Sequence, residues 1–96
     1  MIGITIKELR NLLTVGHEVE FTYNGVTYVL RPEITDGRSY LVIWDCAPSG
    51  KCLCSYPIPE KGEIPAECLD AVLIDQCFGG KSFMEVESHI TVDVIF

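Results

Sequence analysis

The chain has 96 residues, which corresponds to one domain, and its hydrophobic content of 48% is sufficient to fill one modest core. The formal net charge of −7 argues against binding to nucleic-acid phosphates or to anionic membranes, because both modes require clustered lysine and arginine. No stretch approaches the ~18 consecutive apolar residues that predict a membrane-spanning helix.

The first predicted element is an amphipathic helix over residues 5–15. Thr5 and Glu8 have the spacing of a capping box, in which each residue's side chain accepts a hydrogen bond from the other's backbone N–H. Gly16 follows as a helix terminator. Apolar residues recur at helical spacing between these ends, at Ile6, Leu9, Leu12 and Leu13.

A β-hairpin is predicted over residues 18–31. Asn24-Gly25 is typical of a type I′ turn, which needs positive φ at both central residues, and the flanking Val, Phe, Tyr and Thr favour extended backbone. A two-residue loop places Glu18 opposite Arg31 on a polar face. The other face then carries three apolar or aromatic pairs, which are Val19 with Leu30, Phe21 with Tyr28 and Tyr23 with Val26.

The rest of the chain predicts further strands and two short helices. Residues 40–44 and 51–56 read as strands that complete an antiparallel meander, with a turn at 47–50 between them and a proline-rich loop at 57–65 after them. Pro65 is expected in the first turn of one short helix, and Ser82 with Glu85 has the spacing of a second capping box at the start of another. Residues 91–96 form a last strand. The fold class is therefore α+β in a single domain over residues 1–96, with a meander of four to five strands.

The five cysteines predict reduced thiols. Their odd number and the absence of a secretion signal favour a cytoplasmic protein. A four-cysteine zinc site would use Cys46, Cys52, Cys54 and Cys68, and Cys52 and Cys54 are expected on one face of their strand. Because this spacing lacks the usual C-x2–4-C pairs, we interpret the cysteines as core thiols without metal or cofactor, and keep a zinc-stabilised domain as an alternative.

No catalytic motif is complete. His17 and His89 have no cysteine or aspartate at the spacing of a known nucleophile motif, so a Cys77–His89 pair requires a tertiary contact. Residues 79–82 resemble the end of a phosphate-binding loop, but Asp75 stands where that loop needs its first glycine. We therefore do not expect an enzyme, and keep a small enzyme as a lesser alternative.

The aromatic residues exceed what so small a core can hold. The predicted interaction residues are Trp44, Tyr56, Phe78 and Phe96, and Tyr40 and Phe83 belong to the same surplus. The apolar last strand is an edge that pairs either within the sheet or with another chain. The leading hypothesis is a small acidic module that binds a protein partner. The alternative is a homodimer built by edge-strand pairing.

Two segments also carry a family resemblance. The first is Gly16-x-Glu18-Val-Glu20-Phe21-x-Tyr23-Asn24-Gly25-x-x-Tyr28, preceded by a short helix, and the second is Gly80-Lys81-Ser82-Phe83-x-Glu85-Val86. Together they cover about a third of the chain and resemble a loose group of small uncharacterised proteins from Firmicutes and their prophages. This resemblance implies a cytoplasmic protein carried on a mobile element, and carries over no established activity. Under the leading hypothesis, the interaction module is a regulator or a host-factor antagonist of phage or mobile-element origin.

Overall fold

The computed structural model describes residues 1–46, 50–59 and 62–96. The predicted turn at 47–50 and loop at 57–65 therefore lie partly outside the described residues. The predicted α+β class is confirmed. Among the described residues, no helix is both long and apolar enough to cross a membrane.

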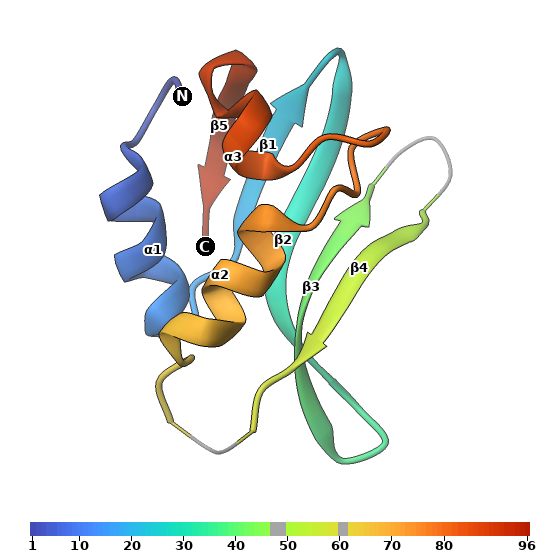
Figure 1. Cartoon of the computed structure of the whole chain (residues 1–96). Coiled ribbons are helices and arrows are strands. Elements are labelled where there is room, and N and C mark those ends of the chain that lie inside the picture. Colours follow the sequence, from blue (N-terminus) through green and yellow to red (C-terminus); the bar gives the residue numbers. More distant parts are fainter. Residues whose placement is uncertain (47–49, 60–61) are drawn as a thin grey trace.

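One antiparallel sheet of five strands organises the molecule, in the order β4-β3-β2-β1-β5 (Figure 1). The first four strands form the predicted meander. The last strand returns to pair antiparallel with β1, so it pairs within the chain. The strands are β1 (Val19–Tyr23), β2 (Val26–Thr35), β3 (Arg38–Asp45), β4 (Cys52–Pro57) and β5 (Ile90–Ile95).

The helices lie together on one face of this sheet (Figure 1). They are α1 (Ile6–Thr14), α2 (Ala66–Ile74) and α3 (Phe83–Val86), and a short 3-10 turn (Glu87–His89) links α3 to β5. Both predicted capping boxes are present, at Thr5 with Glu8 and at Ser82 with Glu85. The sequence predicts Pro65 inside the first turn of its helix, whereas the structure places Pro65 one residue earlier, as the N-cap of α2.

The hairpin of β1 and β2 has the predicted register. Val19 pairs with Leu30, and the φ angles of Asn24 and Gly25 are 54° and 78°, as a type I′ turn requires. The expected contact between Arg31 and Glu18 is an ion pair of 3.2 Å. Local turn chemistry and alternation therefore specify this part of the sheet.

The core lies between the sheet and the helices and is centred on aromatic rings. Phe21 contacts Phe83 at a centroid distance of 5.3 Å and Phe78 at 6.2 Å. The expectation that Phe78 and Phe83 belong to an exposed surplus is wrong, because both are buried. The physical reason is a tight turn in which Phe78 and Lys81 exchange backbone hydrogen bonds of 2.9 and 3.3 Å. Two glycines with positive φ between them, Gly79 and Gly80, allow the chain to fold Phe78 back onto the sheet.

Candidate functional site

The four predicted interaction residues lie in four different environments. Phe78 is buried in the core, and Phe96 is exposed beside the end of β5. Tyr56 is half-buried on β4, and its hydroxyl donates to the Asp75 carboxylate. Trp44 is half-buried on β3, on the sheet face that carries no helix. The structure therefore does not join these aromatics into one surface.

Trp44 belongs to a polar network on that face, which we call the open face. Its indole N–H donates to Glu33 at 3.1 Å, and Glu33 also accepts from Arg31 at 3.3 Å. Arg31 reaches Glu18 as well, at 3.2 Å. Because these groups satisfy one another, the network stabilises β2 and β3 and presents no unpaired polar atom of Trp44 to a ligand.

The four-cysteine zinc candidate is not assembled. Cys46 is exposed, and Cys68 Sγ lies 4.0 Å from the Tyr56 carbonyl. Cys52 pairs with Trp44, and Cys54 pairs with Ile43, with a register shift between them. This bulge inserts one extra residue, so Cys52 lies on the open face and Cys54 on the helix face. The expectation that they share a face is therefore wrong.

A different group of side chains is brought together on the helix face. One ligand atom each from Cys54, Asp75 and Cys77 lies within 4.8 Å of the others. Cys54 comes from β4, and the other two come from the segment after α2. We call these three residues the thiol–carboxylate cluster. It includes no histidine among the described residues, so the Cys77–His89 pair is not part of it.

Contacts within the cluster and with the neighbouring Tyr56 shift the pKa values of Tyr56, Cys54 and Cys77. The hydrogen bond to Asp75 raises the pKa of Tyr56 to about 12. The Cys54 thiol is hydrogen-bonded to Cys77, and this bond, followed by burial, raises the pKa of Cys54. The same hydrogen bond lowers the pKa of the Cys77 thiol. Cys77 is therefore the thiol that ionises first.

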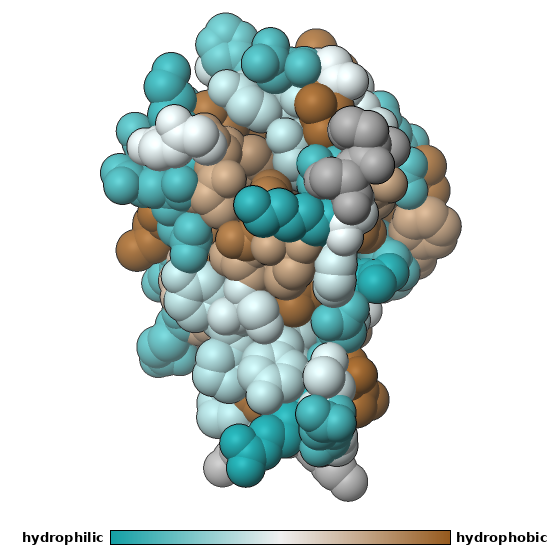
Figure 2. All heavy atoms as spheres, turned by 90° about the vertical axis from the view of Figure 1, so that its right-hand side faces the viewer, coloured by the Kyte–Doolittle hydropathy of each residue, from teal (hydrophilic) through white to brown (hydrophobic). Residues whose placement is uncertain are grey.

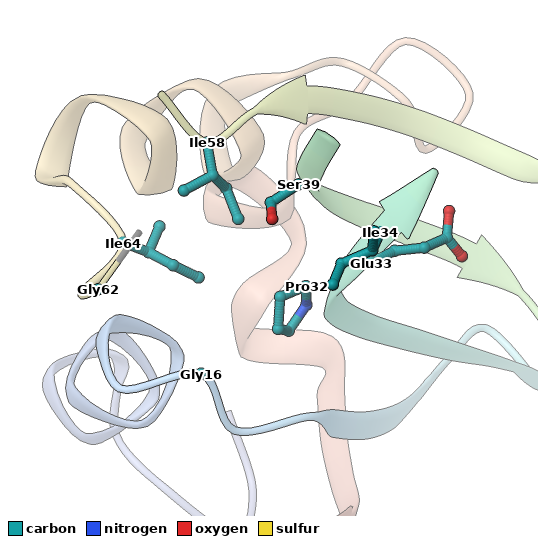
Figure 3. Close-up of a pocket in the computed structure, with 8 residues that line it drawn as sticks. All are labelled: Gly16, Pro32, Glu33, Ile34, Ser39, Ile58, Gly62 and Ile64. Carbon is teal, nitrogen blue, oxygen red and sulfur yellow. The ribbon is translucent and has the colours of Figure 1, made fainter. Parts of the chain in front are cut away.

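Among the described residues, two hollows border the helix face, and apolar side chains dominate the lining of both. The larger, of about 540 Å³, lies between the end of α1, the β2–β3 hairpin and the segment before α2. Figure 3 shows Pro32, Ile58 and Ile64 around it, whereas the carboxylate of Glu33 points away. The other hollow, of about 430 Å³, separates β4 from α2 and is lined by Tyr56 and several prolines. Apolar side chains also gather near the middle of the surface on the β4 side, with hydrophilic ones around them (Figure 2).

The outer edge of β5 carries the greatest concentration of exposed apolar side chains. The exposed fractions are 66% for Ile2, 40% for Val94, 42% for Ile95 and 58% for Phe96. These are four of the eight large apolar residues that are exposed in the described parts of the chain. Ile2 covers only the start of this edge, through backbone bonds to Ile90 and Val92 and a bridge to Thr91.

Comparison with known proteins found no matching family model, no matching curated protein and no matching solved structure. The functional interpretation of this chain therefore depends on its own surfaces. Within the described residues, the β5 edge and the thiol–carboxylate cluster are the features that we develop into functional proposals.

Proposed function

We propose that this protein is a small acidic interaction module that binds an extended segment of a partner protein along the outer edge of β5. The observation that carries this proposal is the exposed apolar series Ile2, Val94, Ile95 and Phe96 on an edge strand. An edge strand offers unpaired backbone N–H and C=O groups, and a partner segment can add to the sheet through them.

The contrast between the two sheet edges supports the choice of β5. Proteins commonly protect edge strands with lysine or proline. At the opposite edge of the sheet, β4 is preceded by Lys51 and ends at Pro57. Residues 90–96 contain neither residue type. Beyond the part that Ile2 covers, and apart from the register shift at Asp93, this apolar edge is open to pairing with another chain.

Charge narrows the chemistry of the partner segment. The chain carries a net charge of −7. Glu20 pairs with Val94 across the β1–β5 ladder, and Asp93 accepts a hydrogen bond from Thr22 at 2.6 Å on the same part of the sheet. A segment that alternates apolar residues with lysine or arginine fits this edge. A second copy of the acidic chain is repelled by charge, which ranks self-association second.

We also propose a biological setting, which is supported by the sequence resemblance alone. We place the protein in a cytoplasm as a binding protein and not as an enzyme, in the role of a regulator carried by a prophage or other mobile element. All five cysteines are free thiols, which is compatible with a reducing compartment.

A displayed library of random 12-residue peptides tests the proposal. Selection on the immobilised protein is expected to yield segments that alternate apolar and basic residues. Calorimetry should then show at least about tenfold weaker binding to Ile95→Lys, because an ammonium group replaces apolar contact at the edge. The matched control is Ile34→Lys, since Ile34 is 75% exposed on β2 and should bind as the wild type does.

Two results contradict this proposal. One is selection of no binding peptide, and the other is equal binding by the two lysine variants. Light scattering over a range of concentrations identifies the second-ranked occupant. A dimer that Ile95→Lys abolishes and Ile34→Lys preserves means that a second copy of the chain takes this edge.

A further inference from the structure

We propose that Cys54, Asp75 and Cys77 bind a zinc ion through two thiolates and one carboxylate oxygen. This site is independent of the β5 edge, and its residues differ from the four-cysteine set that the sequence suggested. In a tetrahedral zinc site with Zn–S bonds of about 2.3 Å, neighbouring ligand atoms lie about 3.5–3.8 Å apart. The three ligand atoms here already lie within 4.8 Å of one another, so they need to approach by only about 1 Å.

The charges around the cluster favour a cation. One carboxylate and two thiols are gathered within 4.8 Å of one another in this cluster. Within the described residues, Asp75 also takes part in no ion pair. A divalent cation neutralises the Asp75 carboxylate together with the thiolates that form as the metal binds.

The fold holds the ligands in place without the ion. Cys54 is fixed in β4 by its pairing with Ile43, and Asp75 is the C-cap residue of α2. The buried ring of Phe78 anchors the chain next to Cys77. Tyr56 donates to one oxygen of Asp75, which orients the carboxylate and leaves its other oxygen for the metal.

The ligand set selects the metal. Two sulfur ligands favour zinc over magnesium and calcium, which prefer all-oxygen sites. On binding, Zn²⁺ displaces the thiol protons of Cys54 and Cys77, and both protons pass to solvent without any oxidation. Water occupies the fourth position, because Asp75 and Cys77 are only half-buried.

Cobalt substitution reports on the ligands directly. The reduced protein, stripped of metal by a chelator, is titrated with Co²⁺ and then with Zn²⁺. One equivalent of Co²⁺ should produce a near-ultraviolet thiolate-to-cobalt band, which one equivalent of Zn²⁺ removes. Cys77→Ser should reduce this band to about half or abolish it, since it deletes one of two thiolates. Native mass spectrometry supplies the stoichiometry.

The variants are chosen so that folding does not decide the outcome. Cys77→Ser and Asp75→Asn change half-buried positions, and each should weaken zinc binding by more than about 100-fold, whereas Tyr56→Phe removes only the orienting hydroxyl and should weaken it by about tenfold. Cys52→Ser is the matched control, because Cys52 lies on the open face and should bind zinc as the wild type does.

Zinc should also protect two thiols of the wild type from alkylation, and peptide mapping should identify them as Cys54 and Cys77. The inference is overturned if the wild type binds no zinc, if Cys77→Ser binds it unchanged, or if Cys52→Ser loses it.

Discussion

Replacing Phe78 with alanine tests whether this residue is a core residue or part of an interaction surface. Phe78 is 8% exposed, and its ring meets those of Phe21, Tyr23, Tyr28 and Phe83 at centroid distances of 5.2 to 6.4 Å. Truncating a core phenylalanine costs about 3–5 kcal/mol. Because Phe78 comes from a loop that can partly collapse into the space, we expect the lower end, about 3 kcal/mol.

Chemical denaturation under reducing conditions measures this loss, and thermal unfolding should show a fall in Tm of about 12–24 °C. The matched control is Phe96→Ala, since Phe96 is 58% exposed and its truncation should change the free energy of unfolding by less than about 0.5 kcal/mol. A loss below about 1 kcal/mol for Phe78→Ala, or equal losses for the two variants, would refute the assignment of Phe78 to the core.

Three further predictions concern local interactions. Ser82→Ala removes the side-chain acceptor for the Glu85 backbone N–H and should lower the free energy of unfolding, measured by urea denaturation, by about 1 kcal/mol. Ser82→Gly should lower it by only a few tenths of a kcal/mol, because glycine is itself tolerated as an N-cap residue. The methyl group added by Gly25→Ala has no other atom within 4 Å, so no steric clash is expected. The variant should lose about 1 kcal/mol in free energy of unfolding because alanine disfavours the positive φ at this position, and nuclear magnetic resonance should show an unchanged hairpin register. The folded protein holds the Tyr56 proton up to a pKa of about 12, whereas the unfolded chain releases it near 10, so stability should fall as pH rises from 10 to 12. Tyr56→Phe should flatten that part of the stability profile, and an identical fall in both proteins would show that Asp75 does not hold this proton.

Much of the fold could be predicted from sequence because its signals are local. Asn24-Gly25 and the alternation around it specify the register in which Val19 pairs with Leu30. Thr5 with Glu8 specifies the start of α1 in the same way. These signals depend on residues within a few positions of one another, so no knowledge of the tertiary structure is needed to read them.

The candidate sites could not be predicted because they depend on contacts between distant segments. Asp75 and Cys77 follow α2, and only the packing of this segment against β4 brings Cys54 to them. The bulge that separates Cys52 from Cys54 also has no turn or glycine signal in the sequence. The Asp75-x-Cys77 spacing was the one available hint, and it is too short a pattern to predict a metal site without its partner.

The position of β5 illustrates the same limit. Its apolar, β-branched composition predicts a strand, but composition does not identify the neighbouring strand. Its pairing with β1 fills one side of β5 and leaves Val94, Ile95 and Phe96 exposed. The strand could thus be predicted from sequence, whereas its place at the edge of the sheet required the fold.

Amide hydrogen exchange with and without a selected peptide tests the central claim most directly. If the partner segment adds to the sheet at β5, the backbone amides of residues 93–95 should exchange more slowly in the complex, whereas the Phe96 N–H already donates to the Glu18 carbonyl within the sheet. Those of β4, at the opposite edge, should be unchanged and serve as the internal control. Protection confined to β4 or to the open face, with residues 93–95 unchanged, would contradict the proposal that β5 is the docking edge.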